Sequence, residues 1–232
     1  QRVVLASGVN AGGVLDGFTV TGANSTTTGG AIRSEGGNPT FRNLTVRGNK
    51  AAFGGGIYIE GGTPTIVNSV FAGNEVQHHG GAVRAAGGAR PVLVNVTIHG
   101  NQAGDRGGAV DTNGSTTQVT LRNAIVWGNT AAGGGQQVHH HAGTTSFEHA
   151  FVQGGCPSGS SCTEVLNADP EFVDAGAGDL GLRPISLAID RGSNGHYPAG
   201  AGDRDLGGAT RIHGASIDLG AYEFQGERVF EP

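Results

Sequence analysis

Apolar and polar positions recur together along the first two thirds of the chain, with a period of about 26 residues. An apolar column is followed five residues later by a second one, and a polar residue, usually Asn, stands between them. A repeat of this length, rich in β-branched residues and Gly, predicts a solenoid of stacked β coils. The first column is Leu15, Phe41, Ile66, Leu93, Leu121 and Phe147, and the second is Val20, Val46, Phe71, Ile98, Val126 and Val152.

Each repeat predicts two clear strands and a variable corner. In the second copy, residues 40–46 form a strand bent at Asn43, Gly48-Asn49 turns the chain, and a second strand lies around residues 57–60 after a Gly pair. Stacked coils place such strands in parallel sheets, about 4.8 Å apart. The sequence therefore predicts an all-β, single-stranded solenoid of about six coils over residues 1–155. The preference of parallel crossovers makes it a right-handed parallel β-helix.

The polar column predicts a structural role for its asparagines. Asn tolerates the left-handed backbone region, and its amide can bond to the copies above and below. We therefore expect a ladder of side-chain amides at the bends, made by Asn43, Asn68, Asn95 and Asn123.

The repeat weakens after His149, and the rest of the chain has a different character. Residues 156–225 are expected to form a C-terminal cap or anchor-like region over the open end of the stack. Residues 226–232 are expected to be a tail. Cys156 and Cys162, the only cysteines, lie in a Gly/Pro/Ser loop and are expected to form a disulfide, which favours an oxidising compartment. The alternative is two free thiols.

Composition excludes several partners. Gly contributes 45 of 232 residues, but the excess is in phase with the repeat and indicates neither collagen nor disorder. A formal charge of −5 lacks the basic stripe that nucleic acid requires. No apolar run of about 18 residues is present, so no transmembrane segment is expected. The chain begins at Gln1 and contains no Met, so we expect a processed or excerpted product.

Two sets of residues carry a resemblance to known proteins. The Gly-Gly-Ala-Ile and Gly-Asn repeats resemble those of bacterial right-handed parallel β-helix proteins of the pectate-lyase-like superfamily. The ending Ile-Asp-Leu-Gly-Ala-Tyr-Glu over residues 217–223, with Ile-Asp-Arg-Gly over residues 189–192, resembles the choice-of-anchor Q domain. Together these cover nearly the whole chain. The resemblance implies a secreted or cell-surface bacterial protein, and it implies no activity.

The outward positions of the second strand set contain the best candidate binding residues. One column is Arg33, Tyr58, Arg84 and Asp111, and the neighbouring column is Glu35, Glu60, Ala86 and Asn113. Acids and bases are both present, so a groove that binds uronate-rich polysaccharide, or a polysaccharide lyase site, is conceivable. The alternative is a solvated surface, which the mixed chemistry of the columns favours.

Two clusters could bind a metal ion. His139 and His141 share one face of an extended segment and could ligate a metal together, or the cluster could be an exposed polar corner. His78-His79 lies in a variable corner and is expected to face solvent. Asp190, Asp203, Asp205 and Asp218 could form a Ca²⁺ site, or they could accept hydrogen bonds from local N–H groups in turns.

The sequence leads to two functional hypotheses. The first is a non-enzymatic structural or adhesive protein, secreted or at the bacterial cell surface, whose copies stack head to tail into filaments. The second is a polysaccharide-binding module or a polysaccharide lyase that acts on uronate-rich glycans. The first is favoured because no convincing catalytic cluster stands out in the outward columns.

Overall fold

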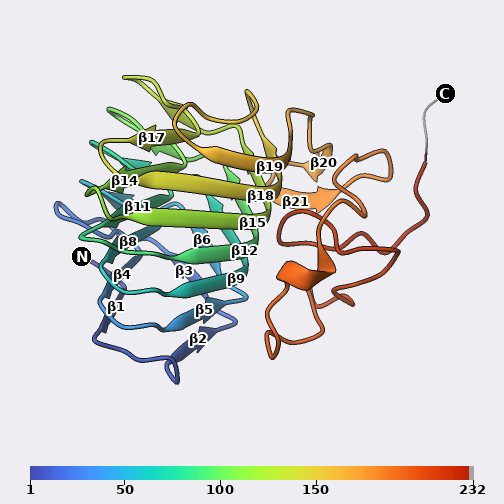
Figure 1. Cartoon of the computed structure of the whole chain (residues 1–232), viewed down its shortest axis with the longest axis horizontal. Helices are drawn as coiled ribbons and strands as arrows, with labels where there is room; N and C mark the ends of the chain where they lie inside the picture. Colours follow the sequence, from blue (N-terminus) through green and yellow to red (C-terminus); the bar gives the residue numbers. More distant parts are fainter. Residues whose placement is uncertain (230–232) are drawn as a thin grey trace.

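The computed structural model describes residues 1–229, and its main body is a parallel β-helix of about six turns (Figure 1). Three parallel sheets, which we call A, B and C, run along the stack, and each coil contributes strands to them in turn. The predicted fold class is confirmed. The described residues contain one short 3-10 helix, η1 (Asn194–His196), and a small antiparallel pair, β20 (Phe172–Asp174) and β21 (Asp179–Leu182).

Sheet A is the face predicted to carry the candidate binding residues. Its strands pair in parallel without a register break, so equivalent residues of successive coils lie side by side. The strands, in spatial order, are β1 (Val4–Ser7), β4 (Ile32–Glu35), β8 (Ile57–Glu60), β11 (Val83–Ala86), β14 (Val110–Asn113) and β17 (Val138–His140).

Sheet B is the longest of the three and continues beyond residue 155, because β19 pairs with β18. Its first two coils divide into two short strands on either side of the bend. The strands are β2 (Val14–Asp16), β3 (Thr19–Thr21), β5 (Thr40–Arg42), β6 (Thr45–Arg47), β9 (Thr65–Ala72), β12 (Val92–His99), β15 (Gln118–Trp127), β18 (Thr144–Val152) and β19 (Ser161–Leu166).

Sheet C is made of two-residue strands just after the Gly-Asn pairs: β7 (Lys50–Ala51), β10 (Glu75–Val76), β13 (Gln102–Ala103) and β16 (Thr130–Ala131). The Gly pair lies between sheets C and A, where successive coils approach each other closely. Gly80 has φ 73°, and a Cβ on Gly81 would collide with the carbonyl oxygen of Gly108 in the next coil. Only Gly satisfies both requirements, which explains why the pair recurs.

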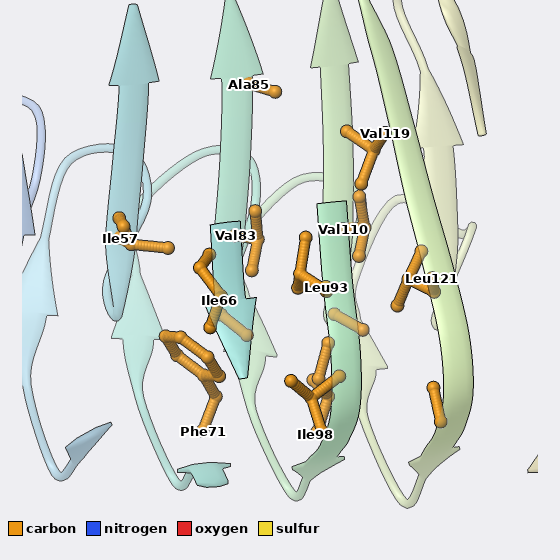
Figure 2. Close-up of a cluster of buried hydrophobic side chains, with 14 of the residues drawn as sticks. Ile57, Ile66, Phe71, Val83, Ala85, Leu93, Ile98, Val110, Val119 and Leu121 are labelled. Carbon is orange, nitrogen blue, oxygen red and sulfur yellow. The ribbon is translucent and has the colours of Figure 1, made fainter. Parts of the chain in front are cut away.

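The core fills the space inside the sheets with stacked aliphatic and aromatic side chains. Figure 2 shows Ile66, Leu93 and Leu121 stacked from coil to coil, with Phe71 and Ile98 beside them. All five are at most 1% exposed, as the apolar columns predicted.

The bend predicted at the polar column is confirmed. Asn43, Asn68, Asn95, Asn123 and His149 all have positive φ, between 45° and 54°. This left-handed residue lets inward positions shift from the residue two places before it to the residue one place after it. Asn is the non-Gly residue that adopts this conformation most readily, which accounts for its recurrence.

The continuous amide ladder, however, lies in the other Asn column, that of the Gly-Asn pairs. Asn49, Asn74, Asn101 and Asn129 are at most 2% exposed, and each Nδ2 donates to the next Oδ1 at 2.8–2.9 Å. Gln137 ends the ladder by accepting from Asn129 Nδ2 at 2.8 Å.

In the predicted ladder column one side-chain amide bond joins neighbouring asparagines, from Asn123 Nδ2 to Asn95 Oδ1 at 3.2 Å. The other amides turn outward: Asn43 donates to Asp16, and Asn68 donates to Tyr197 and to the Arg204 carbonyl oxygen. Asp16 belongs to the preceding coil, whereas Tyr197 and Arg204 belong to the C-terminal segment, which offers competing acceptors to the later asparagines of this column.

Residues 168–225 lie along the outer face of sheet B (Figure 1). The sequence had instead predicted a cap over the open end of the stack. Sheet B presents an apolar outward column here, and the C-terminal segment covers it. Leu182, Ile189 and Leu219 pack on Ile125 and Phe151, both at most 1% exposed. Of the predicted tail, residues 226–229 are described, and residues 230–232 lie outside the described part.

Candidate functional site on sheet A

The predicted outward column is a single continuous row on sheet A. The strand register places Arg33, Tyr58, Arg84 and Asp111 side by side, and adds His139 on β17. Alternate residues point into the core, so this row faces outward. With strands about 4.8 Å apart, five residues extend over about 19 Å.

One end of the row is a cation–aromatic cluster. The Arg33 guanidinium lies 5.2 Å from the centre of the Tyr58 ring and forms an ion pair with Glu35. The Tyr58 hydroxyl donates to Glu60 Oε2 at 2.8 Å. Burial, together with this bond and the charge of Glu60, raises the pKa of Tyr58 to about 12. Tyr58 is therefore a neutral hydrogen-bonding group at physiological pH.

The other end is a buried charge cluster. Asp111 is fully buried, and its Oδ2 lies 2.8 Å from Arg84 Nη1 while its Oδ1 lies 2.7 Å from His139 Nδ1. The Arg84–Asp111 contact is an ion pair without a hydrogen bond, and Oδ2 accepts no other hydrogen bond from residues 1–229. The Arg84 guanidinium also lies 4.6 Å from the centre of the Phe53 ring.

The corner between sheets C and A contributes His79 to this cluster. Its ring stacks on that of His139, with centroids 5.7 Å apart, and burial lowers the pKa of His79. The ligand atoms of His79, Asp111 and His139 all lie within 4.8 Å of one another. His78, by contrast, pairs with Asp105 at 2.9 Å and is nearly half exposed.

The sequence did not predict this grouping. It offered a metal pair of His139 and His141 or an exposed polar corner, and favoured the corner, whereas residues 138–140 are a strand of sheet A. Gly135 and Val138 continue the columns of Gly107 and Val110 with a step of 28 residues, but Gln136 replaces the second Gly of the pair. His79 was expected to face solvent, and stacking on His139 half-buries it. The ring of His141 lies 6.4 Å from that of His139 and belongs to no metal-competent group among the described residues.

The four aspartates considered for Ca²⁺ lie in the C-terminal segment and mainly organise its backbone. Asp218 accepts from the amides of Asp190 and Phe224, both at 2.7 Å, and Asp190 accepts from Ser216 at 3.0 Å. Within residues 1–229 these carboxylates do not gather three ligand atoms within 4.8 Å.

The other two aspartates differ from each other in burial and contacts. Asp205 is 5% exposed and accepts from the amides of Ala209 and Glu223, both at 2.8 Å. Asp203 is at the surface, with 90% of its side chain exposed. These contacts are the turn chemistry that the sequence offered as the alternative, and Ca²⁺ binding stays a prediction.

Asp218 and Glu223 form a buried cluster with Arg211, whose side chain is 1% exposed. Burial raises the pKa of Asp218 to about 6 and that of Glu223 to about 7. One guanidinium balances one carboxylate, so the second carboxylate favours its protonated form. Arg211 also donates to the carbonyl oxygens of Asp218 and Gly220, both at 3.0 Å.

We expect this pair to make the fold less stable as pH rises from about 4 to about 7. The folded state binds more protons than the unfolded state in that window, so the free energy of unfolding falls with pH. For Glu223, a pKa raised from 4.5 to about 7 corresponds to a loss on the order of 3 kcal/mol. Urea denaturation across this window should show a shallower decline for Glu223→Gln than for wild type. Glu227→Gln, at an exposed position, should match wild type; equal slopes for all three proteins would contradict the prediction.

The predicted disulfide is present and joins the loop after β18 to the start of β19. Cys156 and Cys162 are bonded, with Cα atoms 6.0 Å apart. No helix among the described residues has the length and apolar character needed to cross a membrane.

Three parallel sheets wound into one stack define the class of this protein, a right-handed parallel β-helix. The family described as "Right handed beta helix region" matches residues 5–152, and the chain belongs to it. This fold supports membership of the pectate-lyase-like superfamily. No curated protein and no solved structure matches the chain.

Proposed function

We propose that this protein is an extracellular, non-enzymatic adhesive β-helix that binds an acidic polysaccharide along the outer face of sheet A. The observation that carries the proposal is the unbroken row of Arg33, Tyr58, Arg84, Asp111 and His139 across five coils. A row perpendicular to the strands suits an extended polymer, because successive coils offer groups at regular spacing.

The chemistry of the row fits sugar acids. Guanidinium groups bind carboxylates through paired, charge-assisted hydrogen bonds, and aromatic rings cover the apolar faces of ligands. Arg33 and Glu35 keep 23% and 35% of their side chains exposed, so a ligand can reach them. A uronate carboxylate would replace Glu35 as the partner of Arg33.

Binding without cleavage is proposed because the charged groups of the row engage one another. Asp111, the carboxylate nearest the histidines, is fully buried and is held by Arg84 and His139. A general base must reach the proton that it removes. Incubation with pectate and alginate should therefore produce no rise in unsaturated-product absorbance, with or without Ca²⁺; such a rise would establish a lyase.

The extracellular location is proposed from the disulfide, since such bonds persist in oxidising compartments. Attachment to a bacterial surface is proposed from the resemblance of residues 217–223 to the choice-of-anchor Q ending. Head-to-tail stacking of copies stays a prediction. Electron microscopy at high protein concentration tests it, and persistent monomers would contradict it.

We expect Arg33→Ala to weaken binding to polygalacturonate or alginate by about 10- to 100-fold, as loss of a charge-assisted hydrogen bond costs about 1.5–3 kcal/mol. Affinity electrophoresis in chelator measures the effect. The matched control is Arg122→Ala, because Arg122 forms a similar ion pair with Glu148 on sheet B. No binding by wild type to any acidic polysaccharide, or equal loss in both variants, would refute the proposal.

A further inference from the structure

The cluster at the Asp111 end of the row contains more metal-ligating side chains than the Arg84–Asp111 ion pair requires. His79, Asp111 and His139 come from three different coils, and their ligand atoms lie within 4.8 Å of one another. Two imidazoles and one carboxylate are a donor set typical of zinc sites. We propose that these three residues bind a single transition-metal ion of the Zn²⁺ class.

An unsatisfied polar atom supports this assignment. His79 Nδ1 is buried and has no hydrogen-bond partner among the residues that the structure describes. Asp111 is 0% exposed, and Arg84 pairs with its Oδ2, so Oδ1 is the oxygen that an ion would bind. A buried polar group without a partner is costly, and a metal ion that ligates the cluster removes much of that cost.

The geometry requires small adjustments. A tetrahedral ion with bonds of about 2.0–2.1 Å holds its ligand atoms about 3.3 Å apart. Asp111 Oδ1 and His139 Nδ1, now 2.7 Å apart, move apart slightly as the ion displaces the shared proton. His79, on a corner loop, rotates inward. Three protein ligands leave the fourth position for water or for an oxygen of a bound ligand.

Two arginines surround the site and have different roles. Arg84 holds the second oxygen of Asp111 and orients the carboxylate, as residues around metal ligands commonly do. Arg106 is exposed, and its Nη1 lies 3.4 Å from His139 Nε2. When the metal takes Nδ1 of His139, Nε2 carries the proton, so the weak Arg106 contact breaks. Removing Arg106 is therefore expected to leave metal affinity unchanged or to increase it.

Metal binding is tested on the untagged protein alone, without polysaccharide, so its outcome does not depend on the proposed function. Isothermal titration with Zn²⁺ should give one equivalent, and Co²⁺ should give a visible absorption band of tetrahedral intensity. His79→Ala, His139→Ala and Asp111→Asn should each lower affinity at least tenfold. Far-UV circular dichroism confirms that the variants are folded. His79→Ala is the decisive variant. His79 lies on a half-buried corner and not in the core, so its loss should leave the fold intact.

The chain offers close controls in its other histidines. His78→Ala removes the neighbour of His79, and His141→Ala removes the neighbour on the β17 side; both should retain wild-type affinity. Zn²⁺ should raise the melting temperature of wild type and both controls, but not of His79→Ala. No binding by wild type, or binding that survives His79→Ala and His139→Ala, would overturn the proposal. Binding lost in His78→Ala or His141→Ala instead would also overturn it, since the ion would then lie elsewhere.

Discussion

Replacing Asn101 by alanine is expected to lower the free energy of unfolding by about 3–5 kcal/mol, because each buried polar group left without a partner costs about 1–3 kcal/mol. Asn101 is fully buried in the middle of the amide ladder. Its Oδ1 accepts from both the backbone N and Nδ2 of Asn74, and its Nδ2 donates to Asn129 Oδ1 and to the carbonyl oxygens of Phe71 and His99. Alanine removes all five bonds and offers no replacement.

Urea denaturation followed by far-UV circular dichroism measures this loss. The matched control is Asn113→Ala. This asparagine lies on β14, the strand of sheet A that follows Asn101 along the chain, and it is only partly buried. Its expected effect is within about 0.5 kcal/mol, as for ordinary surface substitutions. If Asn101→Ala cost no more than this control, the ladder would be a geometric by-product of stacking and not a source of stability.

Stacking interactions between equivalent residues explain why the coils could be predicted from the sequence. Each inward residue packs on its own copy in the next coil, so Ile66, Leu93 and Leu121 form a column in the sequence and in space alike. The outward row on sheet A follows from the same register. The left-handed bend also could be predicted, since it limits the residue type to Asn, Gly or His.

Contacts between non-equivalent residues escaped prediction because no period relates them. His79 meets His139 only because a variable corner loop folds toward sheet A. The docking of the C-terminal segment had a signal nonetheless. The outward column of sheet B begins with Thr19 and Thr45 and then, apart from Thr97, becomes apolar at Val70, Ile125 and Phe151, and outward apolar residues indicate a covering layer.

The ladder column illustrates a different limit. Both Asn columns recur equally well, so recurrence alone does not say which amides bond to one another. The Gly-Asn column is enclosed by its own coil, whereas the bend column faces outward toward other acceptors. Burial does not separate the columns, because Asn68, Asn95 and Asn123 are also 0% exposed; the acceptors that each amide meets in the folded chain decide which ladder forms.

Gly220→Ala is expected to detach the C-terminal segment from sheet B, at a cost of about 2–5 kcal/mol from the combined backbone and packing penalties. Gly220 has φ 87°. A Cβ there would lie 2.7 Å from Thr97 Oγ1 and 2.9 Å from Ile125 Cδ1. The segment docks directly on sheet B here, because the Gly220 amide donates to the Asn123 carbonyl oxygen at 2.8 Å.

The matched control, Gly208→Ala, separates the two penalties. Gly208 has the same φ, 87°, but an added Cβ meets nothing within 4 Å, so only the backbone cost of about 1–2 kcal/mol applies.

Detachment in Gly220→Ala should expose Ile125 and Phe151, giving faster proteolysis between residues 168 and 225 and stronger binding of a hydrophobic dye, while the β signal of the coils persists. Equal behaviour of the two variants would mean that the tight fit at Gly220 does not hold the segment. Loss of the whole β signal in Gly220→Ala would mean that the coils and the segment unfold as one unit, because the apolar face of sheet B cannot remain in water.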